Sequence, residues 1–270
     1  MHIFYSEFQK DYSSYTFSYA PYCIFESIEN IGSIYSSGFL PYTGNPEMAD
    51  HLYYMARSLR VELSEFELSS ENRRVIRKFE KFPVRRQWIE KKNFDLDNPE
   101  IRKFWLRFCK VRFRNGEMSE SRLHYILESP FATGIIRYTI NEMHAGDVLI
   151  SHHGKMLHYW FSFYELEEFK DLPLGKYLML DVIRQCKEKK FQYVYLGTCY
   201  GRGSLYKVRD FKGIHYFDGG EWRKDLDVLK EWCKKDDDPL SVDRFKSLSC
   251  ADQQKMIKRR SAQKNSLSKM

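Results

Sequence analysis

Two short runs rich in aromatic residues enclose a segment with helical spacing, and this order constrains the fold more than any other feature. The runs are residues 156–164 and 192–196, and a third strand is expected at 147–150. Pro173 stands where the first turn of the enclosed helix is expected. Apolar residues then recur at intervals of four, at Leu174, Leu178, Val182 and Cys186. A strand, a helix and a strand in this order predict a parallel crossover, the unit of an α/β sheet.

Other segments predict the elements around this crossover. Residues 58–66 alternate apolar and polar side chains, which is the period of a half-buried strand. Ser69 followed by Glu71 is typical of a helix start and opens a basic helix. Residues 99–114 have the spacing of an amphipathic helix, which Gly116 closes. The apolar side of that helix carries Ile101, Trp105 and Phe108 or Cys109.

The two ends of the chain differ from its middle. Residues 12–25 predict short strands or extended loop, and 26–36 predict a helix that ends at Gly38. Residues 38–46 are dense in Gly, Pro and Asn and predict a loop. Near the other end, residues 251–260 predict an isolated helix before a disordered Ser/Lys tail.

We therefore expect an α/β (α+β) fold with a mixed sheet and flanking helices. Residues 1–81 would form a smaller N-terminal α+β region, 82–233 the main region, and 234–270 a charged linker and basic tail. The 270 residues, 43% of them hydrophobic, suffice for one large core or two modest ones. No stretch approaches the roughly 20 apolar residues of a membrane span. Because the first residues also lack a signal-peptide pattern, we expect a cytoplasmic protein with no membrane partner.

The cysteines and histidines do not suggest a metal site. No two cysteines form a CxxC pair, so neither a disulfide framework nor a zinc ribbon is indicated, and reduced thiols in the core are expected. The six are Cys23, Cys109, Cys186, Cys199, Cys233 and Cys250. His152, His153 and His158 lie on a predicted hairpin without a nearby Cys or Asp partner, which favours ordinary polar residues. We expect no metal and no cofactor.

The formal net charge is +7, and the basic residues are not spread evenly along the chain. Basic residues cluster on the helix that Ser69 opens and again at 102–114. A basic track in a chain with 16% aromatic residues suits a folded RNA, because lysine and arginine neutralise phosphates and planar rings stack on bases. The common alternative is a solvated helix face without a ligand.

Residues 191–222 carry the most informative motifs. The predicted strand over Tyr193–Leu196 runs into Gly197, and a turn with the sequence Gly201-Arg202-Gly203-Ser204 follows. Next comes the polar and aromatic run Tyr206-Lys207-Val208-Arg209. Successive N–H groups in such a turn cradle phosphates in some proteins, although a flexible turn is the commoner case.

With several earlier blocks, this segment resembles the arginyl-tRNA protein transferase family, as a divergent bacterial-type member. The resemblance extends from Tyr19 to Trp222. Its ordered blocks are Tyr19-Ala20-Pro21 with Gly38-Phe39, Arg60-Val61-Glu62-Leu63 with the helix after Ser69, 111–118, Leu174-Gly175, Tyr195-Leu196-Gly197 and Tyr206-Lys207. The resemblance implies a GNAT-like catalytic half without acetyl-CoA. It also implies two substrates, an aminoacyl-tRNA and an acceptor protein with a free N-terminus.

The chain departs from the family pattern at three places. The clustered cysteines that would hold an iron–sulfur cluster or zinc are missing, and Met55 and Ser58 stand roughly where thiols would be expected. Phe113 replaces a histidine that the family often shows. The residues after Gly38-Phe39 are Leu40-Pro41-Tyr42-Thr43 in place of basic residues and Ser.

The reaction that the resemblance implies needs positioning more than acid–base power, because the aminoacyl ester is already activated and an α-amine has an ordinary pKa near 8. In a GNAT-like sheet the splayed strand end would present backbone groups to the reacting atoms. The catalytic residues we expect are Tyr195, Leu196, Gly197, Thr198, Tyr206 and Lys207. The tRNA-binding residues we expect are Arg73, Arg74, Arg77, Lys78, Arg112 and Arg209.

Plainer interpretations stand beside these. Tyr195 is also typical of a core strand, Trp105 and Trp160 of core aromatics, and Asp181 faces solvent on the helical count. Two other functions stay open. One is an acyl-CoA-dependent N-acyltransferase, for which Leu172–Tyr177 has only one glycine of the expected phosphate loop. The other is a non-catalytic RNA-binding relative.

Overall fold

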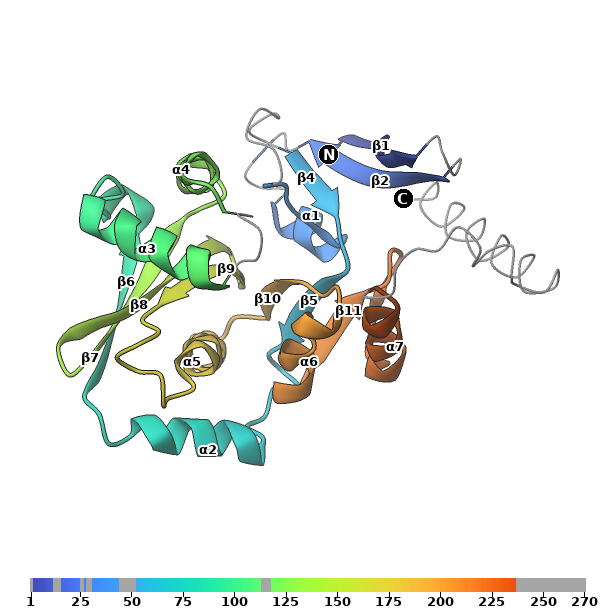
Figure 1. The fold of residues 1–270 in the computed structure, drawn as a ribbon. Coiled ribbons are helices and arrows are strands. Elements are labelled where there is room, and N and C mark those ends of the chain that lie inside the picture. The colour runs from blue at the N-terminus through green and yellow to red at the C-terminus, as the bar shows by residue number, and fades with distance from the viewer. Residues whose placement is uncertain are drawn as a thin grey trace.

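The computed structural model describes residues 2–11, 16–24, 27, 31–43, 52–112 and 118–236. Within these residues the strands form two sheets (Figure 1). The smaller sheet is antiparallel throughout, and the short helix α1 (Ile31–Ser36) lies beside it. Its strands, in spatial order, are β1 (His2–Asp11), β2 (Thr16–Ile24), β4 (Leu52–Met55) and β3 (Phe39–Pro41).

The larger sheet has eight strands and is mixed. Its spatial order is β12 (Trp222–Arg223), β11 (Ile214–Phe217), β5 (Ser58–Glu62), β10 (Tyr193–Thr198), β9 (Met156–Tyr164), β8 (Met143–His153), β7 (Gly134–Ile140) and β6 (Val84–Glu90). Only β9 and β10 pair in parallel among these strands; every other neighbouring pair is antiparallel.

The expected parallel crossover is confirmed. β9 leads through α5 (Leu174–Glu188) into β10, and the two strands pair in parallel. α5 packs on the sheet through its predicted apolar positions, since Leu178 and Val182 are fully buried. A parallel pair needs such a crossover because the second strand must start at the same edge as the first.

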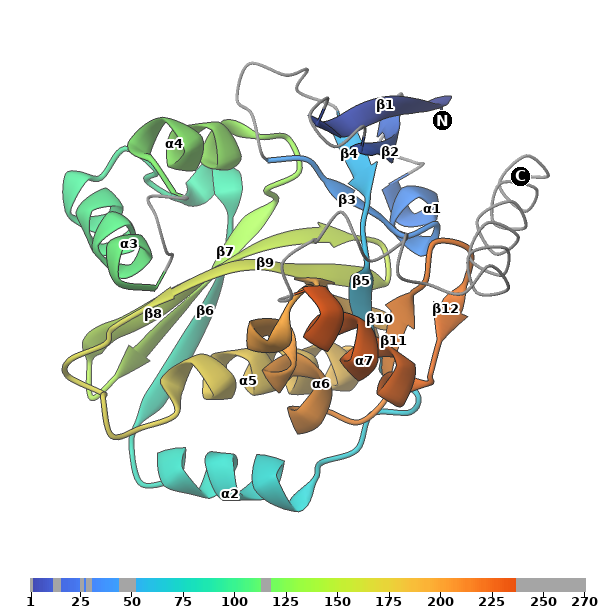
Figure 2. The same ribbon diagram turned by 45° about the vertical axis from the view of Figure 1, so that its right-hand side comes forward.

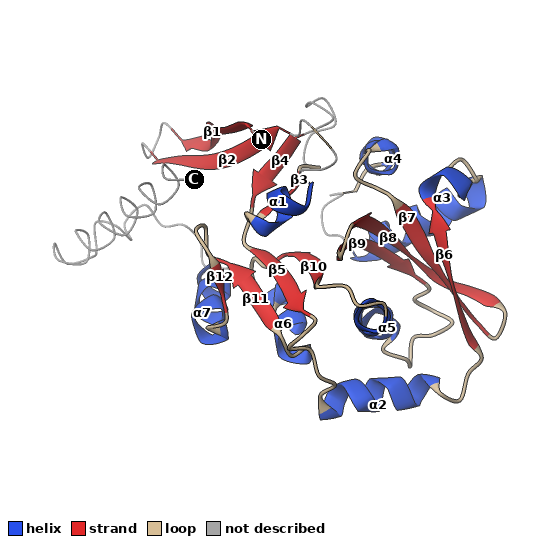
Figure 3. Ribbon diagram, turned by 180° about the vertical axis from the view of Figure 1, so that it is seen from behind, coloured by secondary structure: helices blue, strands red, loops and turns tan. Residues whose placement is uncertain are grey.

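Helices cover both faces of the larger sheet (Figure 2). On one face lie α2 (Ser70–Phe79), α5, α6 (Tyr206–Asp210) and α7 (Leu226–Asp236). The other face carries α3 (Pro99–Arg112) and α4 (Glu120–Glu128) over β7 to β9, and α1 over β9 and β10. Seen from behind, the strands form one twisted layer between these helices (Figure 3). Ile135 and Ile136 of β7 are therefore both buried, because each faces a different helix layer.

Several local predictions are confirmed. Ser69 caps α2 by accepting a hydrogen bond from the backbone N–H of Asn72 at 3.1 Å. Trp105 of α3 is buried, and its indole N–H donates to the carboxylate of Asp147 at 2.9 Å. The five described cysteines are buried, as expected for core residues.

Two local predictions are wrong. Residues Phe39–Pro41 of the expected loop form β3, because they pair with β4. Asp181 does not face solvent; it is fully buried, accepting hydrogen bonds from Arg86 at 2.6 Å and from the hydroxyl of Tyr138 at 3.0 Å. Helical count finds the polar side of α5, but it does not show that β6 and β7 supply partners there.

Some predictions fall outside the described residues. These are Phe113, the helix end at Gly116 and the helix at 251–260. The strand β5 lies inside the larger sheet, between β11 and β10, although its residues belong to the expected N-terminal region. The division into 1–81, 82–233 and 234–270 stays a prediction. Among the described residues no helix is long and apolar enough to cross a membrane.

Candidate functional site

The end of β10 leaves the regular ladder of the sheet. Pairing with β9 ends at Tyr195 and His158, although β10 continues to Thr198. Pairing with β5 is interrupted between Tyr195 and Thr198 by a register shift that adds one residue to β10. Gly197 lies in this bulge with φ +76°, a left-handed conformation that glycine adopts without strain. Bulges of this kind free backbone groups for other partners.

Lys207 supplies such a partner. This residue lies on α6, and its Nζ donates to the carbonyl oxygens of Leu196 at 2.8 Å and Thr198 at 3.1 Å. Burial lowers the pKa of Lys207 to about 8, and the nearby Cys199 thiol opposes that shift. Because an ammonium has three N–H donors, one remains for a further partner. The strand end therefore holds a positive charge fixed by two of its carbonyls.

His158 approaches the same place from β9. Its side chain is only 2% exposed, and its Nδ1 lies 3.0 Å from the hydroxyl oxygen of Tyr35 on α1. Its Nε2 is buried and has no hydrogen-bond partner among the described residues. Burial, followed by the charge of Lys207, lowers the pKa of His158 to about 3, so the imidazole is neutral at physiological pH.

The two side chains meet at Gly197. A Cβ atom placed on this glycine would lie 3.8 Å from His158 Nε2 and 3.9 Å from Lys207 Nζ, with no other heavy atom beyond its chain neighbours within 4 Å. The position thus has room for a methyl side chain on residue 197, bordered by an imidazole nitrogen and an ammonium. A neutral base and a cation across one small space are a suitable environment for a nucleophile and a developing negative charge.

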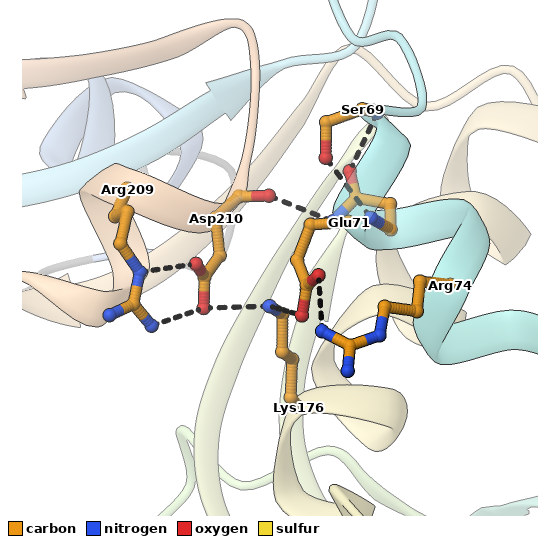
Figure 4. A network of polar contacts seen from close by, with 7 residues as sticks. Ser69, Glu71, Arg74, Lys176, Arg209 and Asp210 are labelled. Carbon is orange, nitrogen blue, oxygen red and sulfur yellow. Dashed lines mark hydrogen bonds and ion pairs between the residues drawn. The ribbon is translucent and has the colours of Figure 1, made fainter. Parts of the chain in front are cut away.

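An ion-pair network holds α6 in place (Figure 4). Asp210 at the end of α6 accepts hydrogen bonds from Arg209 at 2.7 and 3.0 Å, and Lys176 of α5 pairs with it at 3.1 Å. Lys176 also donates to Glu71 of α2 at 3.2 Å. Burial disfavours the ionised carboxylate of Asp210, but the hydrogen bonds from Arg209 and Lys176 outweigh it and lower its pKa. α2, α5 and α6 are therefore tied together near Lys207.

A second set of contacts fixes the loop after β10. Arg57 pairs with Asp236 of α7 at 2.7 Å and donates to the carbonyl oxygen of Cys199 at 3.3 Å. The carboxylate of Asp236 also accepts from the backbone N–H of Gly201 at 2.9 Å. The Sγ atoms of Cys199 and Cys233 lie 3.6 Å apart in the core beneath this loop. The turn at Gly201–Ser204 is thus held from α7.

The predicted catalytic residues divide into two groups. Leu196, Gly197, Thr198 and Lys207 lie together at the strand end. The side chain of Tyr195 points into the core and is 1% exposed. Its ring packs against the ring of Tyr35, with 5.0 Å between the two ring centroids. Tyr206 is 43% exposed. Burial raises the pKa of Tyr195 to about 12, so its hydroxyl stays protonated.

The predicted RNA-binding cations lie on the surface but not all are unpaired. Arg73, Arg74, Arg77 and Lys78 are exposed on α2. Arg74 pairs with Glu71 at 3.5 Å, and Arg73 donates to the carbonyl oxygen of Leu68 at 2.6 Å.

The last two predicted cations lie nearer to the start of α5. Arg112 borders a cavity of about 250 Å³ between the end of α3 and the start of α5. The guanidinium of Arg209 is 74% exposed while it pairs with Asp210.

His158 was expected to be an ordinary polar residue, and nothing in the sequence singled out Tyr35. A lone histidine in a strand carries no signal of its own, since its role depends on its cross-strand neighbour Tyr195 and on a helix far away in the sequence. Among the described residues no group of three or more His, Cys, Asp or Glu side chains is arranged to hold a metal ion.

A crossover strand with a bulged end, a lysine fixed by backbone carbonyls and a neutral imidazole thus lie together at the end of β10 in an α+β fold. Residues 101–202 match the family described as "Arginine-tRNA-protein transferase, C terminus". Over this stretch the chain is similar to that family, and the resemblance found in the sequence is confirmed there. The matched region contains α3, β9, α5 and β10, and it ends before Lys207.

No curated protein sequence matches the chain significantly. Among solved structures, the C-terminal domain (DUF2156) of a protein described as a lysylphosphatidylglycerol synthetase from Agrobacterium fabrum is 11% identical, with a TM-score of 0.40, over 70% of this chain and 56% of that one. L-PGS from Bacillus licheniformis is 13% identical, with a TM-score of 0.43, over 74% and 68%. The chain thus spans a little more than half of the first of these structures.

Proposed function

We propose that this protein transfers an amino acid from a charged tRNA to the N-terminal α-amine of an acceptor protein, at the end of β10. The observation that carries the proposal is the ammonium of Lys207, held by the carbonyls of Leu196 and Thr198 next to Gly197. The family match over residues 101–202 supports the same chemistry. Arginine is the amino acid, and an acidic N-terminal residue the acceptor, that we expect. The reaction would take place in the cytoplasm.

The step is an aminolysis of an ester. The neutral amine attacks the carbonyl carbon of the aminoacyl ester, a C–N bond forms, and the bond from that carbon to the ribose oxygen breaks. The amine loses one proton and the departing ribose oxygen gains one, so no further reactant is needed. The remaining N–H of Lys207 would stabilise the negative oxygen of the tetrahedral intermediate. Holding both substrates together supplies roughly 7–11 kcal/mol of the barrier reduction.

The predicted RNA contacts fit a tRNA that approaches from the side of α2, α5 and α6. Arg112 and Arg209 lie near the start of α5 and on α6, and the cations of α2 are linked to the same region by Glu71 and Lys176. We assign the aminoacyl end of the tRNA to the strand end and its phosphates to these exposed cations.

A charging assay tests the proposal. Purified protein would be mixed with a peptide that begins with an acidic residue and with one of three donors: radiolabelled arginyl-tRNA, another labelled aminoacyl-tRNA, or acetyl-CoA. Label transfer from arginyl-tRNA to the free peptide, and none to the same peptide with an acetylated N-terminus, is the expected result. Transfer only from acetyl-CoA would establish the acyl-CoA alternative. tRNA binding without any transfer would establish the non-catalytic RNA-binding alternative.

A further inference from the structure

A row of buried polar side chains crosses the larger sheet next to Gly197. The strand register places Ser151, His158, Tyr195 and Arg60 opposite one another on β8, β9, β10 and β5. Each is 9% exposed or less. Buried polar atoms normally have hydrogen-bond partners. His158 Nε2 therefore needs an explanation, since it has none among the described residues.

The surroundings of His158 indicate which ring nitrogen carries the proton. The hydroxyl of Tyr35 can donate or accept a hydrogen bond, so its oxygen can accept from an N–H at His158 Nδ1, 3.0 Å away. The ammonium of Lys207 lies on the Nε2 side and favours a lone pair there over an N–H. A buried acceptor without a hydrogen-bond partner also costs less free energy than a buried N–H without one. His158 thus presents a bare Nε2 toward Gly197.

We propose that His158 Nε2 accepts a hydrogen bond from the attacking α-amine and orients its lone pair toward the ester carbonyl, an inference that rests on the proposed function. The ideal Cβ position of Gly197 lies 3.8 Å from Nε2, so no side chain of this residue covers the nitrogen. Nε2 is buried in the structure, and the amine reaches it when the bulge at Gly197 moves aside.

In this role His158 accepts a hydrogen bond but does not take the proton. The ionisable groups around it are Tyr35 from α1, Tyr195 from β10 and Lys207 from α6. Burial raises the pKa of both tyrosines, so neither carries charge at neutral pH. The one charged neighbour, Lys207, disfavours protonation of the imidazole. His158 therefore stays neutral between pH 6 and 9 and would contribute no limb to the pH profile of the reaction.

Two substitutions distinguish the contributions of the two ring nitrogens of His158. In His158→Gln the amide oxygen reaches about as far as Nε2, so it can accept from the amine. In His158→Asn the shorter amide replaces Nδ1 beside Tyr35 but leaves the Gly197 space without an acceptor. We expect His158→Asn to lower kcat/KM for the acceptor peptide about tenfold or more, with KM for aminoacyl-tRNA unchanged. We expect His158→Gln to stay within about threefold of the unsubstituted protein, with the same pH profile.

Equal loss in the two variants, or none in His158→Asn, would overturn the inference while label transfer by the unsubstituted protein upholds the proposed function. A second measurement needs no transfer. Nitrogen NMR of the ¹⁵N-histidine-labelled protein should show an unprotonated Nε2 for His158, whose resonance moves when a peptide with a free N-terminus is added and not when the peptide is acetylated. An unmoved resonance at saturating peptide would overturn the inference. If the His158 resonance shifts with the peptide but the protein transfers no label from aminoacyl-tRNA, the amine site is supported. Aminoacyl-tRNA is then ruled out as the donor substrate.

Discussion

The charge of Lys207 is controlled by its surroundings, which makes pH a direct test of its role. Its ammonium is needed to stabilise the oxyanion, so the rate should fall as pH rises through the lowered pKa of about 8. The acceptor amine must be neutral, so the rate should rise as pH approaches its own pKa near 8. A bell-shaped profile with its maximum near pH 8 is expected for single-turnover transfer, after correction for spontaneous ester hydrolysis.

Lys207→Arg should remove the alkaline limb of that profile. A guanidinium keeps its charge above pH 12, so the variant's rate, although lower in absolute value, should level off above pH 8. Lys212→Arg is the matched control, since Lys212 is an exposed residue that pairs with Glu67. A falling alkaline limb that persists in Lys207→Arg would assign the loss of activity to another group.

Gly197→Ala should fill the space between His158 and Lys207 and also strain the backbone. The φ of +76° costs a residue with a side chain about 1–2 kcal/mol, which denaturant unfolding would measure. The transfer rate should fall by more than the stability loss explains, because the methyl group lies against His158 Nε2 and Lys207 Nζ and covers the nitrogen that the amine is proposed to reach. Gly203→Ala is the control: its Cβ would meet nothing within 4 Å. A Gly197→Ala protein with normal transfer would show that the amine binds elsewhere.

At the scale of elements, the network around Asp210 connects the site to its supporting helices. Asp210→Asn removes the charge that Arg209 and Lys176 share, so we expect a loss of about 1–3 kcal/mol in unfolding free energy at pH 7. The folded pKa of Asp210 is lowered, so its stabilisation is present above the ordinary pKa near 4 and is lost as pH falls below it. Urea unfolding at pH 7 and pH 3.5 should show the difference between the two proteins shrinking.

Asp227→Asn is the control for that measurement. Asp227 pairs with Lys230 on α7 while its side chain is 90% exposed, and such exposed pairs add little to stability because solvent screens them. An Asp210→Asn protein as stable as this control would mean that the network does not hold α6.

The helix α2 carries the cations best placed to test RNA binding. No ion pair among the described residues involves Arg77 or Lys78, so both are available for phosphates. Replacing both with Gln should weaken tRNA binding and reduce the slope of log affinity against log salt by about one to two. Arg85→Gln with Lys92→Gln removes the same number of charges from around β6 and should leave the slope unchanged. Equal slopes for all three proteins would remove α2 from the RNA interface.

The sequence predicted elements better than it predicted the site. The crossover was readable because Leu174, Leu178 and Val182 repeat at helical spacing, and Ser69 predicted a helix start through local chemistry. At Gly197 the sequence showed only a glycine at the end of a predicted strand, and it did not predict the bulge. The pairing of His158 with Tyr35, and the burial of Asp181 under Arg86, depend on contacts between segments far apart in the chain. Local periodicity carries no information about such contacts.

At the scale of the whole molecule, β5 lies between β10 and β11 although residues 63–192 separate it from β10 in the chain. The candidate site needs this insertion, since the bulge at Gly197 is defined by the pairing of β10 with β5. Pulse-labelled hydrogen exchange during refolding should therefore show the amides of β5, β10 and β11 becoming protected in one phase. Protection of β5 well before β10 would contradict this coupling.

The same insertion sets an order of events on the ribosome. After β5 is synthesised, roughly 130 further residues must follow before β10 exists, which takes about 7 to 26 s at about 5–20 residues per second. During that interval the edges of β5 lack the partners they have in the finished sheet, and an unpaired strand is a template for wrong association. A nascent chain therefore depends on its own later residues, or on a chaperone, to cover β5. Rare codons placed between β5 and β10 would lengthen this exposure and lower the yield of active protein.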